Sequence, residues 1–303
     1  MPDSPCHRPL SDAGPVVWVD DPDDQRLDPY RDLPDSSGRM QREAASRLFV
    51  VEGRLAVARL LTSPYRVRSL LVDDHQVAPA RDLVEATQAQ GAPVYVAPRS
   101  VVARTVGFAL HRGVVAVADR PPPNDALAVL AAVCARPRAA GAVQVVAVLE
   151  GLNDHENIGA LFRNAAAFGV GAVLLDPTCA DPLYRRSIRV SVGHVLHMPF
   201  ARVTPWPGSL DQVRARGFLI AALAPRPADS GKATAELSVL RALATTRDSP
   251  DGVAIILGAE GNGLSPAALA AADVVVSIRM ADGVDSLNVA TAAAIAFHAV
   301  ADR

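Results

Sequence analysis

The chain has 303 residues, half of them hydrophobic, and a formal net charge of −2, which is enough length and apolar content for two ordinary folded domains. It has no uncharged apolar run of about 18 residues, so a transmembrane helix is not expected. Its first residues, Met-Pro-Asp-Ser-Pro, lack the basic and apolar parts of a secretory signal, and cysteines 6, 134 and 179 are too far apart for metal-type pairs or a disulfide framework. These features predict a cytoplasmic protein.

The charge is unevenly distributed along the chain. Residues 1–35 contain nine Asp and only three Arg, a net charge of −6, which leaves +4 for the remainder. Arginine binds phosphate groups well, so this pattern permits an RNA partner without requiring one. The acidic part would repel a phosphate backbone and is not expected to contact RNA.

Residues 1–38 are rich in Pro, Asp, Ser and Gly and predict an acidic lead-in that is mostly irregular. A small α/β domain is predicted for residues 39–120, because apolar runs alternate with amphipathic stretches. Its strands are expected at 47–53, 67–74, 92–98 and 111–119, and its helices at 54–63 and 80–91. The proline run in 120–125 marks the boundary, because proline can neither donate to a sheet ladder nor continue a helix.

Residues 121–140 predict a linker and a first helix, and residues 141–303 predict a second α/β domain. Its strands are expected at 143–150, 170–176, 217–225, 252–258 and 273–280, and its main helices at 157–169 and 285–301. These strands are mostly uninterrupted apolar runs. Such runs between helices are typical of a parallel sheet that is covered on both faces.

The glycine-rich stretch GAEGNGLSP, residues 258–266, permits two interpretations. In a dinucleotide-binding Rossmann unit the glycine turn follows the first strand, and an acidic residue about 20 positions later binds the ribose. Here the turn lies near the C-terminus, Asp273 comes too early, and Glu260 would repel a pyrophosphate. A carboxylate is better tolerated beside a positively charged ligand such as a sulfonium. A nucleotide- or NAD-binding enzyme remains the alternative.

Three segments of the second domain contain clusters of small and polar residues. They are residues 153–169, with Asn157, Gly159, Arg163 and Asn164; residues 258–265; and residues 283–299, with Ser286 and Asn288 before a helix. With the R-x-S-x-G pattern inside 185–200, they resemble the motifs of the SpoU (TrmH-type) RNA ribose 2′-O-methyltransferases of the SPOUT superfamily. The resemblance covers about residues 140–303, and residues 49–116 are similar to the small substrate-binding domain often found before it.

The resemblance implies a fold and a reaction. The fold would be a C-terminal SPOUT-type α/β domain with a parallel sheet and a deep trefoil knot, preceded by a small L30e-like domain that binds substrate. The reaction would be methyl transfer from S-adenosyl-L-methionine to a ribose 2′-hydroxyl of rRNA or tRNA, without a metal. The family also implies a homodimer in which the partner subunit contributes an arginine to each site. A non-catalytic RNA-binding protein with the same fold is a further alternative, which the intact motif residues disfavour.

The resemblance also assigns site residues. The expected catalytic residues are Asn157, Arg163, Glu260, Ser286 and Asn288. The expected donor-binding residues are Leu257, Gly258, Glu260, Gly261, Gly263, Ile278, Met280, Ser286 and Leu287. The glycines would let the backbone approach the donor closely. Two departures from the family pattern are Asp154-His155-Glu156, where Asp-Pro often precedes the first Asn, and Arg279, where a proline is usual.

Several of these residues have competing interpretations. Arg163 could act as a base or as a phosphate and ribose clamp, and the clamp is favoured because a guanidinium rarely loses its proton. Ser286 and Asn288 are residue types that cap helix N-termini. Glu260 could fix its loop or assist proton movement. For Leu257, Ile278 and Leu287, packing in the core is the competing interpretation.

Overall fold

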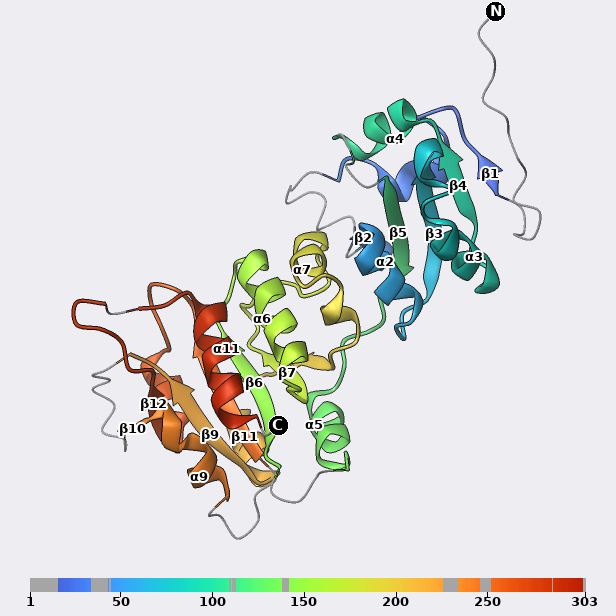
Figure 1. Ribbon diagram of the computed structural model, residues 1–303. Coiled ribbons are helices and arrows are strands. Elements are labelled where there is room, and N and C mark those ends of the chain that lie inside the picture. The colour runs from blue at the N-terminus through green and yellow to red at the C-terminus, as the bar shows by residue number, and fades with distance from the viewer. Residues whose placement is uncertain are drawn as a thin grey trace, which may run out of the picture. The chain divides into compact units, whose positions relative to one another are not determined.

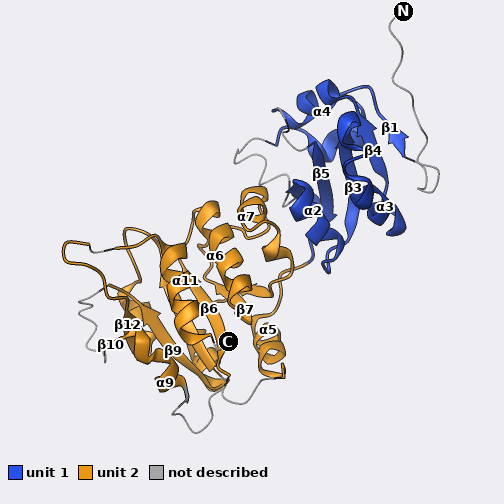
Figure 2. Cartoon of the chain, viewed as in Figure 1, with its two compact units in different colours: residues 1–121 blue, residues 122–303 orange. Residues whose placement is uncertain are grey.

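A computed structural model (Figure 1) gives the arrangement of the chain. It describes residues 16–33, 43, 45–108, 110, 113–137, 142–225, 234–245, 252–284 and 286–301. The chain divides into two compact units, residues 1–121 and residues 122–303, which are coloured separately in Figure 2. Among the described residues, no helix has the length and apolar character needed to cross a membrane.

The first unit is built on a five-stranded mixed sheet in the order β1-β4-β3-β5-β2. The strands are β1 (Val17–Trp18), β2 (Leu48–Glu52), β3 (Val67–Asp73), β4 (Val94–Ala97) and β5 (Val114–Asp119). Strand β4 is parallel to β1 and β3, whereas β5 is antiparallel to β2 and β3. The expected alternation of strands and helices in a small α/β domain is therefore present in this unit.

Helices pack on this sheet in two groups. Helices α2 (Arg54–Leu61) and α3 (Arg81–Ala89) contact each other, α2 also contacts β2 and β5, and α3 also contacts β3 and β4. Helix α4 (Arg99–Val106) packs with a 3-10 helix, η1 (Gln25–Tyr30), and both contribute to one apolar cluster with residues of β2, β3, β4 and β5. The sequence analysis did not identify α4, β1 or η1.

Part of the acidic lead-in is folded into the core of this unit. Leu27, Tyr30 and Leu33 are each at most 1% exposed. The Tyr30 hydroxyl lies 2.6 Å from Ser69 Oγ of β3, and burial raises the pKa of this tyrosine well above its usual range. The prolines and aspartates of the segment indicate irregular backbone, but its few apolar side chains anchor that backbone to the sheet. Residues 1–15 and 34–38 lie outside the described residues.

The second unit contains a seven-stranded sheet in the order β10-β12-β9-β11-β6-β7-β8, and every pairing is parallel. The strands are β6 (Gln144–Glu150), β7 (Ala172–Leu175), β8 (Phe200–Arg202), β9 (Phe218–Leu223), β10 (Thr234–Glu236), β11 (Gly252–Gly258) and β12 (Val274–Ser277). The prediction of a parallel sheet is confirmed. The central strands are buried along almost their whole length, which explains their uninterrupted apolar sequences.

Helices cover the sheet of the second unit. Helices α5 (Ala126–Cys134), α8 (Leu210–Ala215) and α10 (Pro266–Ala271) add apolar side chains to one core cluster with alternate residues of the strands. Helix α6 (His155–Ala167) packs against α7 (Arg185–Val190) and α11 (Val289–Val300), and α11 also contacts β11 and α9 (Leu240–Thr245). Figure 1 shows α6 and α11 side by side in front of the sheet.

Candidate active site

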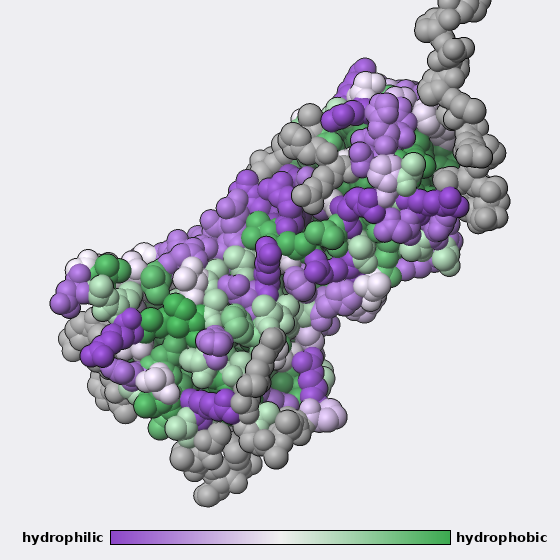
Figure 3. All heavy atoms as spheres, viewed as in Figure 1, coloured by the Kyte–Doolittle hydropathy of each residue, from purple (hydrophilic) through white to green (hydrophobic). Residues whose placement is uncertain are grey.

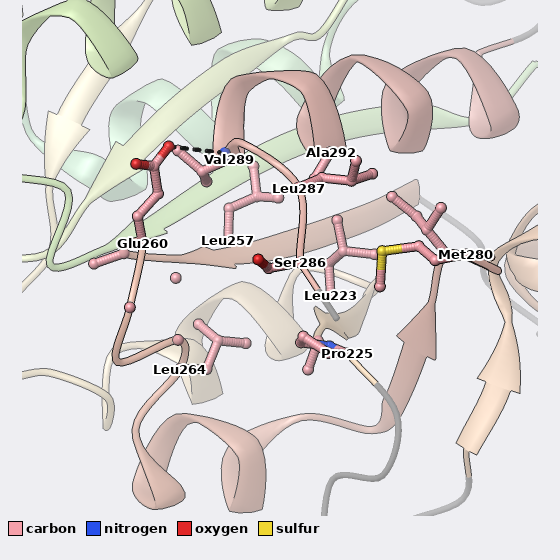
Figure 4. Close-up of a pocket in the computed structure, with 16 residues that line it drawn as sticks. Leu223, Pro225, Leu257, Glu260, Leu264, Met280, Ser286, Leu287, Val289 and Ala292 are labelled. Atoms are coloured by element: carbon pink, nitrogen blue, oxygen red, sulfur yellow. Dashed lines mark hydrogen bonds between the residues drawn. The ribbon is translucent and has the colours of Figure 1, made fainter. Parts of the chain in front are cut away.

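A pocket opens at the carboxyl ends of β9, β11 and β12 (Figure 4). Its lining residues are Leu223, Ala224 and Pro225 at the end of β9 and just beyond it; Leu257–Gly261, Gly263 and Leu264 at the end of β11 and in the loop that follows; Ile278 and Met280 after β12; and Ser286, Leu287, Val289 and Ala292 around the start of α11. The carboxyl edge of a parallel α/β sheet is the usual place for a ligand, because loops from neighbouring strands converge there.

All nine donor-binding candidates line this single pocket, although they come from three separate segments of the chain. Most of the lining side chains are apolar, and Glu260 and Met280 lie at opposite ends, with the Ser286 hydroxyl between them (Figure 4). Leu223, Ala224 and Pro225 were not predicted as lining residues, because an apolar strand end carries no sign of facing a pocket. Val289 and Ala292 were not predicted either, because they follow the helical pattern of α11.

The glycine loop, residues 259–265, folds back on itself immediately after β11. The Gly263 amide donates a 3.0 Å hydrogen bond to the Ala259 carbonyl. A β-carbon on Gly258 would lie 2.5 Å from the Gly263 carbonyl carbon and 2.6 Å from the Leu264 amide nitrogen, so no larger residue fits there. Gly261 and Gly263 have φ values of +90° and +63°, which glycine adopts readily. The loop's own backbone therefore requires Gly258, in addition to any demand from a ligand.

A polar cluster joins the three motif segments at the Glu260 carboxylate. Its Oε1 accepts hydrogen bonds from Asn288 Nδ2 at 2.7 Å, Asn157 Nδ2 at 3.2 Å and the Val289 amide at 3.3 Å, the last of which Figure 4 marks with a dashed line. Asn288 Nδ2 also donates to Asn157 Oδ1 at 2.8 Å. A carboxylate at a helix N-terminus is favoured by the helix dipole. The structure thus brings together three of the five catalytic candidates.

Polar side chains of the motif segments also fix the starts of two helices. Asn288 is the N-cap of α11, and its Oδ1 accepts from the amides of Ala290 at 3.0 Å and Thr291 at 3.2 Å. Asp154 caps α6 in the same way. Asn164 of α6 donates a 2.8 Å hydrogen bond to the Ala290 carbonyl, which holds α6 against α11. Part of the motif pattern therefore has a structural cause in helix capping.

The two remaining catalytic candidates lie apart from this cluster. Ser286 lines the pocket two residues before the cap of α11. Arg163 lies on α6, is exposed and does not line the pocket; within the described parts of the chain it makes no hydrogen bond or ion pair. Its guanidinium is therefore available to an anionic group from outside this chain, as a phosphate clamp requires.

Cys179 and Asp273 lie outside the pocket, and each is held by hydrogen bonds within the fold. Cys179 is buried, donates to the Leu149 carbonyl at 3.4 Å, and has its pKa raised to about 12 chiefly by burial, so it stays a thiol near neutral pH. Asp273 accepts from Arg214 Nε and from the Ile220 amide, each at 2.9 Å, and precedes β12 at the edge opposite the pocket. In that position it cannot bind a ribose in the pocket. The described residues include no cluster of three His, Cys, Asp or Glu side chains able to hold a metal ion.

Comparison with known families matches both units. A model of the SpoU rRNA Methylase family matches residues 144–298, and a model described as RNA 2′-O ribose methyltransferase substrate binding matches residues 50–123. An uncharacterised tRNA/rRNA methyltransferase of Mycobacterium tuberculosis is 43% identical over 283 residues, which cover 93% of this chain and 91% of that protein.

Solved structures agree in fold at lower sequence identity. An rRNA methyltransferase from Sinorhizobium meliloti with bound AdoMet superposes with a TM-score of 0.72 at 21% identity, over 94% of this chain and 97% of that one. The SpoU methyltransferase AviRb from Streptomyces viridochromogenes, in complex with AdoMet, gives a TM-score of 0.71 at 21% identity, over 92% of this chain and 98% of that one.

Proposed function

Because this chain belongs to the SpoU rRNA methylase family, we propose that it is an S-adenosyl-L-methionine-dependent methyltransferase acting on a ribose 2′-hydroxyl of rRNA or tRNA. The observation that carries the proposal is the convergence of nine donor-binding candidates in one pocket beside the Glu260 cluster. The match of the first unit to a substrate-binding family of RNA 2′-O ribose methyltransferases supports the ribose as the acceptor.

The chemistry of the pocket fits the proposed donor. Leu257, Ile278 and Leu287 offer apolar walls for an adenine ring, and the backbone of the glycine loop offers polar groups beside them. Glu260 places a carboxylate at one end, which suits a ligand with a sulfonium and an amino group and disfavours a pyrophosphate. When bound, the donor supplies the methyl group, and its positive charge is neutralised on transfer.

The residues of the chain would act mainly by positioning. A ribose hydroxyl is a poor nucleophile, so its orientation and the removal of its proton limit the rate. Arg163 is exposed on α6 and would bind a phosphate beside the target ribose through charge-assisted hydrogen bonds. Asn157, Glu260 and Asn288 would hold the glycine loop and the start of α11 in fixed relation. Ser286 would contact the donor or the ribose from the pocket wall.

The proposal includes a homodimer and a trefoil knot in the second unit, as the family resemblance implies, and a cytoplasmic location, as the composition predicts. Figure 3 shows apolar residues gathered over α11 on the face in view, and Ile295 of this helix has 38% of its surface exposed. An apolar helical face of this kind supports association with a second copy. Analytical ultracentrifugation of the purified protein measures the oligomeric state, and a monomer at micromolar concentration would contradict the dimer.

Calorimetric titration with S-adenosylhomocysteine and with NAD tests the proposed cofactor. We expect S-adenosylhomocysteine to bind and NAD to give no heat, because the Glu260 carboxylate in the pocket would repel a pyrophosphate. Leu287→Asp provides a matched control, since it puts a charge on the apolar wall and should abolish the binding. Binding of NAD in place of S-adenosylhomocysteine would favour the nucleotide-binding alternative.

A further inference from the structure

A second carboxylate, Glu150, lies beneath the glycine loop and has no part in the chemistry proposed above. Glu150 is the last residue of β6, is 8% exposed, and pairs in register with Gly258, the last residue of β11. Residues paired in register on parallel strands point to the same face of the sheet. Val146 and Val148, which share that face with Glu150, belong to the apolar cluster formed with α5, α8 and α10. Glu150 is therefore a buried charge at the border of an apolar core.

Three hydrogen bonds satisfy this carboxylate. Oε1 accepts from Trp206 Nε1 and from Ser265 Oγ, both at 2.6 Å, and Oε2 accepts from the Ser265 amide at 2.8 Å. Ser265 ends the glycine loop and is the N-cap of α10, where its Oγ accepts from the Ala268 amide at 3.1 Å. Trp206 comes from the connection between β8 and α8 and packs against the same apolar cluster. The carboxylate thus joins the glycine loop to two other parts of the unit.

The position of Glu150 bears directly on the shape of the pocket. The backbone of Gly263 and Leu264 fills the place where a Gly258 β-carbon would be, so the loop returns over the face that carries the Glu150 side chain. Gly263 and Leu264 both line the pocket, and Ser265 follows them directly. The loop is therefore held near Ser265 by Glu150, and at Glu260 by hydrogen bonds from Asn157, Asn288 and the Val289 amide.

We propose that Glu150 is a positioning residue. By accepting hydrogen bonds from Ser265 it holds the C-terminal end of the glycine loop in place, and this sets the affinity of the pocket for the methyl donor. This inference rests on the proposed function, because the pocket is taken to bind S-adenosyl-L-methionine. Glu150 does not line the pocket and acts only through the loop. Its effect should therefore appear in donor binding and leave the affinity for RNA unchanged.

Glu150→Gln is the most informative substitution, because it keeps the shape and removes the charge. The NH2 group of Gln cannot accept a hydrogen bond, so at least one of the three donors facing Glu150 loses its partner. Loss of a hydrogen bond to a buried charged group corresponds to a change on the order of 10-fold or more in an equilibrium constant. We expect S-adenosylhomocysteine to bind the variant at least about 10-fold more weakly than the unaltered full-length chain, with amides 259–264 exchanging hydrogen faster.

Asp273→Asn is the matched control. Asp273 is a partly buried carboxylate that also accepts hydrogen bonds, among them those from Arg214 and the Ile220 amide, but it lies at the opposite edge of the sheet. Its substitution should lower the melting temperature without changing donor affinity or exchange in the loop. Ser265 offers a second test: Ser265→Thr keeps the hydroxyl and should bind normally, whereas Ser265→Ala should weaken binding in the direction of Glu150→Gln.

Calorimetric titration of S-adenosylhomocysteine into these full-length proteins, with hydrogen exchange of the loop peptide, decides the matter. Weaker donor binding and faster loop exchange in Glu150→Gln, with neither change in Asp273→Asn, would support the inference. Normal binding by Glu150→Gln, or by Ser265→Ala if Glu150→Gln does not fold, would overturn it and leave the proposed function intact. Absence of binding by the unaltered protein would overturn both.

Discussion

Asn288 offers a sharp test of the polar cluster, because two parts of its side chain do different work. Its Oδ1 caps α11 by accepting from two backbone amides, and its Nδ2 donates to Glu260 and Asn157. Asn288→Ala removes both functions. Asn288→Asp keeps the cap, because Asp is as good an N-cap as Asn, but it replaces the donor with a second carboxylate facing Glu260.

The size of each effect follows from these contacts. Loss of an N-cap lowers the free energy of unfolding by about 1 kcal/mol. Loss of the hydrogen bonds donated by Nδ2 lowers it by only a few tenths of a kcal/mol more, because both Asn288 and Glu260 are exposed. For a unit of this size, 1 kcal/mol corresponds to about 2–4 °C in melting temperature. Asn288→Ala should therefore lower the melting temperature of the second unit by a few degrees, and Asn288→Asp should lower it less.

Donor binding should show the opposite order. In Asn288→Asp the like charges separate the start of α11 from the glycine loop, so we expect the affinity for S-adenosylhomocysteine to fall at least as far as in Asn288→Ala. Differential scanning calorimetry and titration calorimetry measure the two quantities on the same samples. If both variants bound S-adenosylhomocysteine as the unaltered protein does, the cluster would have no role beyond helix capping, and the reasoning would be refuted.

Four other substitutions or measurements test separate parts of the account. Arg163→Ala should reduce the rate of methyl transfer on the order of 100-fold with donor binding intact. Arg163→Lys should recover little of this rate, because a point charge lacks the bidentate fork. Near-normal turnover of the alanine variant at saturating donor would show that Arg163 has no catalytic role. Gly258→Ala should weaken S-adenosylhomocysteine binding, as its β-carbon meets loop backbone at 2.5 Å; unchanged calorimetric affinity would show that the loop adapts. Cys179 should resist alkylation at pH 8, because burial raises its pKa to about 12 and so shifts thiolate formation to higher pH; rapid labelling of its peptide in a mass spectrum would contradict this. Tyr30→Ala should destabilise the first unit by about 3 kcal/mol or more, as judged by denaturant unfolding, and a loss below about 1 kcal/mol would mean that the lead-in is not part of the core.

The parts of the fold that sequence analysis identifies are those with a strong local signal. Strands β6, β9 and β11 are long apolar runs, and their burial on both faces produces that pattern directly. Strand β1 has two residues, and η1 contains Pro29, so neither has enough length for a periodicity to appear. The apolar anchors Leu27 and Tyr30 are hidden among aspartates, and only the packing against β3 and α4 reveals their role.

The same distinction holds for the site. The glycines and polar residues of the motif segments were identified because their order and spacing resemble the motifs of a known family. The roles of Glu150 and Trp206 were not predicted. Glu150 has the pattern of a polar residue at the end of a strand, and its partner Ser265 lies 115 positions away in the sequence. Contacts over such separations depend on strand order, which the alternation of elements does not determine. The exposure of Arg163 outside the pocket could not be predicted either, because helical spacing alone places it one turn from Gly159 without fixing what it faces.

The central claim is that this protein methylates the 2′-hydroxyl of RNA with S-adenosyl-L-methionine as donor. The most direct measurement is incubation of the purified full-length protein with methyl-labelled donor and total RNA, followed by alkaline hydrolysis and mass spectrometry of the products. The account predicts label in alkali-resistant dinucleotides, because a 2′-O-methyl group blocks cleavage at that position, and predicts its loss with Arg163→Ala. Label confined to base-methylated mononucleotides, or no transfer by a protein that binds the donor, would contradict it.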